Sequence, residues 1–216
     1  IAEWDAQAAA LANFAVGRTV EELRSGAVSE SGYAPEGSDL ASSATIYLGG
    51  YVSAIEAAVT NAQHLGAQTG DTLKLGTITG IGDSTTASAE KDGAAQLNVD
   101  VTALTMNGET ITSCMIDSVQ AKVAFDATGT ITSDVTAPVA TKNELGDNYG
   151  MVAWGGAKAE WNEQAASFAA YVTGKTADEV AGIAITEATK PADADLAASV
   201  TISVIGFMNL IAKAAK

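Results

Sequence analysis

Two spacings of hydrophobic residues divide the chain into three parts. Over residues 3–16, and over the matching stretch 160–173, apolar residues recur every three or four positions, which predicts helices. Between them, residues 73–133 alternate at period two and are rich in Thr, Val and Ile, which predicts an antiparallel sheet. The pattern therefore predicts an α+β fold in which an antiparallel β-sheet is flanked by two helical units.

Turn signals set the limits of the expected strands. MNGET at 106–110 contains Asn-Gly, a strong hairpin signal, and DATGT at 126–130 is a second one. The Gly-rich stretch ITGIGDST at 78–85 is expected to be a turn and not a phosphate loop, because no helix follows it. We expect strands near 73–79, 95–105, 110–116, 119–126 and 129–133.

The two helical stretches are copies of one unit. EWDAQAAALANFAVGRTVEEL, from residue 3, aligns with EWNEQAASFAAYVTGKTADEV, from residue 160, and nine of 21 positions are identical. After one residue of slippage, DLASSATIYLGGYVSAIEAAVT, from residue 39, aligns with DLAASVTISVIGFMNLIAKAAK, from residue 195, and nine of 22 are identical. Agreement over both segments indicates an internal duplication.

The sequence of each copy predicts the same three helices, and the first copy shows the pattern. The first helix carries Trp4 on its apolar stripe and ends at Gly17, a usual residue at that position. Thr19, with Glu three positions later, forms a capping box that starts a second short helix. A third helical run begins at Asp39. Because Trp161 repeats Trp4, we expect each indole to pack in the core of its own unit.

The repeat suggests how the chain is organised. We expect a first helical unit at 1–66, the sheet at 67–140, and a connector with the second helical unit at 141–216. One sheet with one helical unit would be a natural domain. The first unit is therefore either the end of a preceding domain whose sheet is absent, or a second cover for the same sheet.

The composition limits the kinds of partner that the protein could bind. The chain has 26 acidic and 11 basic residues, a formal net charge of −15, so nucleic acid and anionic membrane surfaces should repel it. No apolar run is long enough to predict a transmembrane segment. The single cysteine, Cys114, excludes an intrachain disulfide and is expected to be buried. A chain rich in Ala, Thr, Gly and Ser and poor in Lys and Arg resembles exported bacterial proteins.

SSATIY at 42–47 and ASVTIS at 198–203 carry a resemblance to the bacterial FMN-binding domain. In that family a Ser-Gly-Ala-Thr motif opens the last helix, and a Thr-type position can carry FMN through a phosphodiester bond. The resemblance implies that Thr45 and Thr201 occupy flavin-bearing positions, although serine replaces the motif glycine in both copies. The hairpin LTMNGETITSCMID at 104–117 also resembles that family's central hairpin. The alternative is that each Thr caps the helix after it.

A second resemblance lies after the sheet. TKNELGDNYGM at 141–151, followed by the second helical copy, is similar to repeat-containing exported lipoproteins of anaerobic Gram-positive bacteria. This resemblance implies an extracytoplasmic location, either secreted or at the cell surface. A lipid anchor upstream of the chain would be one means of attachment.

The loop ELGDNYGM at 144–151 is the candidate metal site. Glu144, Asp147 and Asn148 could hold Ca²⁺ through oxygen atoms, although the loop lacks the alternating D-x-D-x-D-G pattern, and a purely conformational loop is the alternative. Trp154 could stack on a flavin ring. We expect no catalytic residues, because His64 has no Ser elbow or paired base and no spaced carboxylate pair stands out.

These observations favour a non-enzymatic exported or cell-surface protein that binds or self-associates and needs no cofactor. If the first helical unit covers the sheet of a neighbouring copy, a head-to-tail contact follows, and such a contact builds a filament when it does not close. The alternative is an extracytoplasmic electron-transfer domain that carries FMN.

Overall fold

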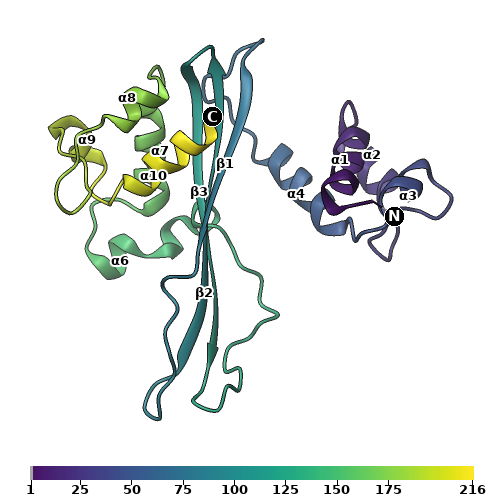
Figure 1. Ribbon diagram of the computed structural model, residues 1–216, viewed down its shortest axis with the longest axis horizontal. Helices are drawn as coiled ribbons and strands as arrows, with labels where there is room; N and C mark the ends of the chain where they lie inside the picture. The colour runs from purple at the N-terminus through teal and green to yellow at the C-terminus, as the bar shows by residue number, and fades with distance from the viewer. Residues whose placement is uncertain (1) are drawn as a thin grey trace. The chain divides into compact units, whose positions relative to one another are not determined.

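Two compact units make up the protein. The computed structural model describes residues 2–216 and separates an N-terminal unit, which ends at His64, from a C-terminal unit, Leu65–Lys216 (Figure 1). The predicted α+β fold is confirmed. The sheet and the second helical copy share one hydrophobic core, and the first copy has a core of its own.

The N-terminal unit contains helices α1 (Trp4–Ala15), α2 (Val20–Gly26), α3 (Asp39–Ser43) and α4 (Gly49–Thr60). Gly17 has a positive φ of 78°, which lets the chain leave α1, and Thr19 forms a capping box with Glu22 at the start of α2. Its core is small and consists of Leu11, Leu23, Ala27, Leu40, Ala44, Leu48 and Val52.

The C-terminal unit is built on one three-stranded antiparallel sheet, in the order β1-β2-β3. The strands are β1 (Thr72–Gly80), β2 (Gly93–Asn107) and β3 (Thr110–Phe125). The predicted Asn-Gly hairpin joins β2 to β3, with Gly108 at a φ of 59°. The stretch 78–85 ends β1 and turns without a following helix, as expected.

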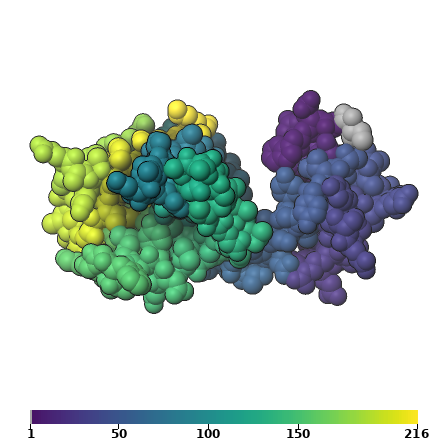
Figure 2. Space-filling model, turned by 90° about the horizontal axis from the view of Figure 1, so that it is seen from below, coloured from purple at the N-terminus to yellow at the C-terminus, as the bar shows by residue number. Residues whose placement is uncertain are grey.

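Helices cover one face of this sheet. After the sheet come α5 (Lys142–Leu145), the 3₁₀ helix η1 (Gly146–Tyr149), α6 (Met151–Gly155), α7 (Trp161–Val172), α8 (Ala177–Ala181), α9 (Ala194–Ser199) and α10 (Ile205–Ala214). α7 packs on β3, and α10 packs on β1 and β2. In Figure 2 these helices, green to yellow, lie together against the teal strands. The largest fully buried side chains here include Leu104, Ile111, Phe168, Leu210 and Ile211.

Two predictions about the elements are wrong. The expected strands 110–116 and 119–126 are one continuous strand, because the Asp117 carboxylate accepts the backbone N–H groups of its neighbour Ser118 and of Asn143 in the connector and is satisfied without a break in the strand. The expected strand at 129–133 makes only an isolated bridge, between Phe125 and Ile131. The segment folds back along the end of β3, and the Thr132 N–H donates to the Ala124 carbonyl oxygen, but the pairing does not extend into a strand.

The third helical run is also not continuous. In each copy a few non-helical residues separate a short helix from the next helix: α3 from α4, and α9 from α10. Ala44 and Val200, which end the short helices, have matching extended conformations, with φ of −134° and −125°. The aligned segments 39–46 and 195–202 therefore each end a short helix and do not open the last helix of their copy.

Candidate functional site

Thr201, which aligns with Thr45 of the first copy, is part of a hydrogen-bonded brace around a buried glutamine. In the C-terminal unit the Gln164 side chain lies fully buried in α7. Its Oε1 accepts hydrogen bonds from the Thr201 backbone N–H, at 2.7 Å, and from the Thr201 hydroxyl, at 3.1 Å. Its Nε2 donates to the Ala159 carbonyl oxygen at 2.8 Å. One amide therefore ties the first helix of the copy to the turn after its third helix.

The N-terminal unit repeats this brace bond for bond. Gln7 Oε1 accepts from the Thr45 N–H at 2.8 Å and from the Thr45 hydroxyl at 3.1 Å, and Gln7 Nε2 donates to the Ala2 carbonyl oxygen. The Thr45 side chain does not cap α4, whose N-cap is Leu48 without a side-chain bond. The capping prediction for these threonines is therefore wrong, and a phosphodiester on either hydroxyl would replace its bond to glutamine.

The surfaces of the two copies differ in what covers them. In the C-terminal unit the Trp161 and Phe207 rings meet edge to face, 5.7 Å apart, and both side chains are only 6% exposed. The matching pair in the N-terminal unit is Trp4 and Tyr51, with ring centroids 6.4 Å apart. Trp4 is 59% exposed, so the prediction that it packs in a core is wrong for this copy.

The exposed pair keeps a defined geometry. Trp4 Nε1 donates to the Tyr51 hydroxyl at 2.9 Å, which joins α1 to α4. Tyrosine stands where the buried copy has Phe207, and a hydroxyl satisfies the indole N–H at a surface that water reaches. Aromatic side chains with one apolar body and one polar group are typical of docking surfaces.

Small residues complete the exposed surface. Leu210, Ala214 and Val172, all buried in the C-terminal unit, correspond to Ala54, Ala58 and Ala15 in the N-terminal unit. We call Trp4, Ala8, Ala12, Ala15, Tyr51, Ala54, Ile55, Ala58 and Val59 the free helical face. All nine are uncharged, and each is half-buried or exposed.

Backbone groups beside the free helical face also lack the partners of their counterparts. In the C-terminal unit the turn after α7 pairs with β3: Gly174 N–H donates to the Ile111 carbonyl oxygen at 2.7 Å, and Ile111 N–H donates to the Lys175 carbonyl oxygen at 2.9 Å. The matching Gly17 N–H and Arg18 carbonyl have no backbone partner among residues 2–216. The N-terminal unit therefore lacks a β-strand at the place where its copy has one.

The acidic loop is held by hydrogen bonds of its own. Glu144 forms a capping box with Thr141 at the start of α5, and the Asp147 carbonyl accepts the Gly150 N–H. Lys142 lies over the Tyr149 ring, 5.0 Å from its centroid, and over the Trp161 ring. Asp147 and Asn148 are both exposed on η1. Among residues 2–216, no three His, Cys, Asp or Glu side chains form a group that could hold a metal ion.

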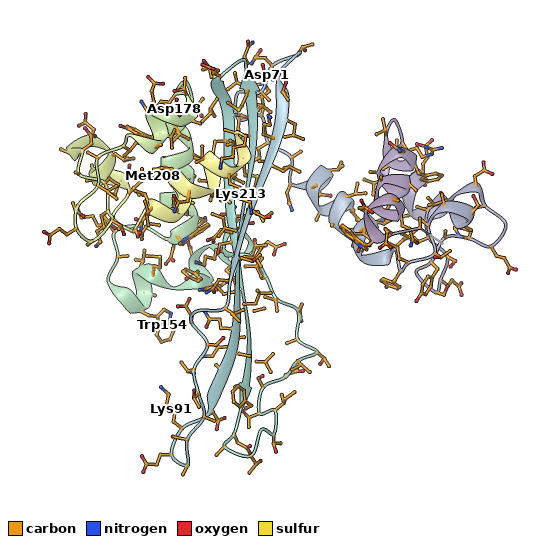
Figure 3. All side chains as sticks on the ribbon, viewed as in Figure 1. Asp71, Lys91, Trp154, Asp178, Met208 and Lys213 are labelled. Carbon is orange, nitrogen blue, oxygen red and sulfur yellow. The ribbon has the colours of Figure 1, made fainter. Side chains whose placement is uncertain are left out.

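Trp154 stands apart from the other aromatic residues. It is 89% exposed and projects from α6, away from the covering helices (Figure 3). α6 is held at its start by Glu160, whose buried carboxylate accepts the N–H groups of Met151 and Val152 at 2.8 and 2.9 Å. Trp154 lies on α6, whereas Thr201 follows α9 and its hydroxyl donates to Gln164.

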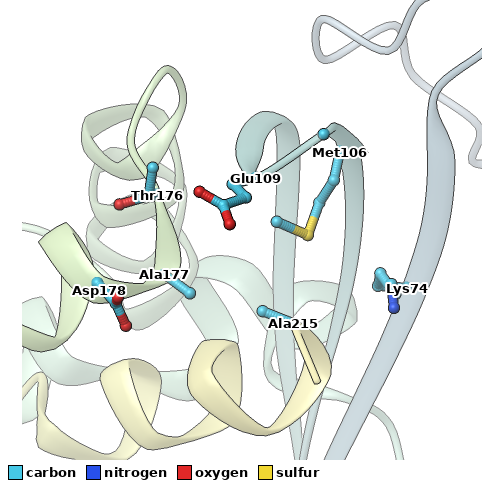
Figure 4. Close-up of a pocket in the computed structure, with 8 residues that line it drawn as sticks. Lys74, Met106, Glu109, Thr176, Ala177, Asp178 and Ala215 are labelled. Carbon is cyan, nitrogen blue, oxygen red and sulfur yellow. The ribbon is translucent and has the colours of Figure 1, made fainter.

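A pocket of about 260 Å³ lies where the β2–β3 turn meets α8 (Figure 4). The polar side chains that line it are Lys74, Glu109, Thr176 and Asp178. The Thr176 hydroxyl is already used, because it accepts the Glu179 N–H in the capping box of α8. The two exposed carboxylates carry no buried, unpartnered atom that would point to a ligand.

Cys114 and His64 take no part in such a site. Burial raises the pKa of the Cys114 thiol to about 11, which leaves it protonated and unreactive at neutral pH. The prediction that Cys114 is a small buried residue is confirmed. His64 is exposed beyond the end of α4.

No protein-family model, curated protein or solved structure matches this chain. None of the helices in the described part of the chain combines the length and apolar character needed to cross a membrane.

The free helical face is the candidate functional site. Residue patterns alone did not identify it, because its members are mostly alanines that also suit an exposed helix. A signal was present in the alignment of the two copies: large residues of the second copy become alanine in the first, while the brace and the aromatic pair are kept.

Proposed function

We propose that the protein is a non-enzymatic extracytoplasmic subunit that self-associates head to tail, through the free helical face of one copy and the sheet of the next. One observation carries the proposal: the same helical unit occurs twice, and the matched surface is buried against a β-sheet in one copy and exposed in the other. Two units with the same internal brace should share a mode of packing.

Charge is compatible with an apolar docking contact between like-charged chains. Each chain carries a net charge of −15, so copies repel at long range, while the free helical face itself is uncharged. Salt screens the repulsion and leaves the apolar contact in place. Association should therefore tighten as ionic strength rises from about 10 mM to 500 mM.

The test is sedimentation velocity of the full chain over a range of concentrations. The unaltered protein should form a concentration-dependent series of oligomers. Ala58→Glu should leave it monomeric, because docking would bury an unpaired carboxylate. Ser53→Glu is the matched control: it adds the same charge to α4, but its counterpart, Asn209, is exposed in the C-terminal unit.

A second pair of variants tests the aromatic part of the face. Trp4→Ala should weaken association, whereas Trp154→Ala removes a more exposed indole outside the face and should leave it unchanged. Circular dichroism of each variant checks that the helices remain folded. A monodisperse monomer of the unaltered protein at high concentration and high salt would overturn the proposal.

A further inference from the structure

We propose that the surface that receives the free helical face is the open face of the sheet, together with the outer edge of β1, in a second copy of this chain. The inference rests on the self-association proposed above and specifies its other half. It follows from the apolar surface of the sheet, the direction of the β1 peptide groups and the sizes of the facing side chains.

The face of the sheet opposite the helices exposes several apolar side chains, although Thr105, Ser113 and Asp117 also lie on it and Ser113 is buried. Along β2 the residues at odd positions lie on this face, and β1 and β3 contribute the residues paired with them. Leu73, Leu75 and Met115 are 63%, 71% and 46% exposed there. Val101 and Ala103 lie between them on β2 and are half-buried. An exposed patch of this kind marks a surface for interaction.

The outer edge of β1 can make the bonds that the N-terminal unit lacks. The peptide groups of Ile111 bind the turn after α7 and so point away from β2. Ile111 and its ladder partner Met106 are therefore not hydrogen-bonded to each other, and the peptide groups of Met106 point toward β1. Met106 pairs with Thr72, whose groups therefore point at β2. By alternation the N–H and carbonyl groups of Leu73 and Leu75 point away from the sheet.

A side-chain bond supports this alternation. The Lys213 ammonium donates to the carbonyl oxygen of Thr77 at 2.6 Å, and α10 supplies it from outside the β1–β2 ladder (Figure 3). Thr77 has the same parity as Leu73 and Leu75. Leu73 and Leu75 thus combine a side chain on the open face with peptide groups at the free edge of β1. Ile111 of β3 likewise combines a side chain on the covered face with peptide groups at the outer edge of β3, where they bind Gly174 and Lys175.

The sheet has an approximate symmetry that places a second helical unit. β1 and β3 both run antiparallel to β2, so they run in the same direction. A half-turn about an axis along β2 exchanges the two faces of the sheet and also exchanges the edges β1 and β3. A helical unit placed by this half-turn would cover the open face and bring Gly17 and Arg18 to β1, as Gly174 and Lys175 lie beside β3.

Side-chain size is complementary in this arrangement. On the covered face the sheet is small and the helix large: a Cβ added at Gly76 would lie 2.8 Å from the Leu210 carbonyl oxygen and 2.9 Å from the Ala214 Cβ. The half-turn sets α1, the counterpart of α7, over β1, so that Ala15 lies near the leucines where the second copy has Val172. It sets α4, the counterpart of α10, over β2 and β3, where Ala54 replaces Leu210 and meets Met115. The alanines of the first copy therefore leave room for the leucines of β1 and for Met115.

The experiment mixes two full-length variants, each with one added cysteine. Ala58→Cys and Met115→Cys should form a mixed disulfide dimer under mild oxidation, seen by mass and on a non-reducing gel, because the half-turn sets α4 over β3. The two cysteines are on different chains, so the bond reports contact between copies, and buried Cys114 should not react. Ser53→Cys replaces Ala58→Cys in the control mixture, which should cross-link much less.

A charge variant gives an independent readout. Leu75→Glu should raise the dissociation constant at least about tenfold, because a carboxylate would be buried on docking. Ile131→Glu, at an exposed residue outside the three strands, should leave the dissociation constant unchanged.

The outcomes separate the two proposals. If Ala58→Glu abolishes association while Leu75→Glu does not, and no mixed disulfide forms, the receiving surface lies elsewhere and only this inference is overturned. If the unaltered protein does not associate at all, the proposed function fails as well. Cross-linking together with the loss caused by Leu75→Glu supports both.

Discussion

At the scale of single residues, the glutamine of each copy explains why the segments 39–46 and 195–202 both contain the threonine. Gln7 and Gln164 are identical in the alignment, and each supplies the oxygen that binds the threonine N–H and hydroxyl. The threonine was the visible feature of the sequence because it matched a flavin motif. Its partner lies 37 residues away, and in the sequence it is only one of the nine identities of the first aligned segment.

The brace predicts a measurable cost. Gln164→Leu would remove the fully buried amide and leave the partly buried Thr201 N–H and Ala159 carbonyl without partners, so the free energy of unfolding of the C-terminal unit should fall by about 1 to 3 kcal/mol. Urea unfolding followed by circular dichroism measures the loss. Gln63→Leu, at an exposed glutamine, is the control, and an equal loss in both variants would contradict the brace.

At the scale of elements, tertiary contacts override the local pattern in two places. β3 continues through Asp117 because the connector, at Asn143, donates to its carboxylate. The helical run after residue 39 breaks near Thr45 because Gln7 binds the backbone there. In both cases a hydrogen-bonding group distant in sequence, the Asn143 N–H or the Gln7 side chain, binds a polar group that otherwise signals a turn or a helix.

The contact between α10 and β1 yields an element-scale prediction. Gly76→Val would push a side chain into the α10 backbone and should destabilise the C-terminal unit by about 1 to 3 kcal/mol. Gly80→Val lies on the same strand with nothing within 4 Å and should be neutral or slightly stabilising. Thermal unfolding compares the two variants, and equal melting temperatures would show that the close approach costs nothing.

At the scale of the whole molecule, separate cores imply separate unfolding. The N-terminal core has seven buried residues and the C-terminal core has nineteen, so the N-terminal unit should unfold first in urea. Leu48→Ala should lower the stability of the first transition by about 2 to 5 kcal/mol and leave the second unchanged.

The reciprocal variant completes that test. Ile211→Ala should shift only the second transition, because this residue is buried in the C-terminal core. Circular dichroism follows both transitions at a protein concentration low enough to keep the chain monomeric. A single transition that moves with either variant would mean that the two units unfold together.

The sequence by itself determined the fold class, the duplication, the capping boxes, the glycine ends of the first helices and the Asn-Gly hairpin. These features depend on neighbouring residues, and periodicity and capping are local. Only the tertiary structure decided that Thr45 and Thr201 bind glutamine, that Trp161 is buried while Trp4 is exposed, and that one face of the sheet stays open. Burial depends on what packs against a residue, and the two copies of one helical unit receive different surroundings because only one of them has strands in its core.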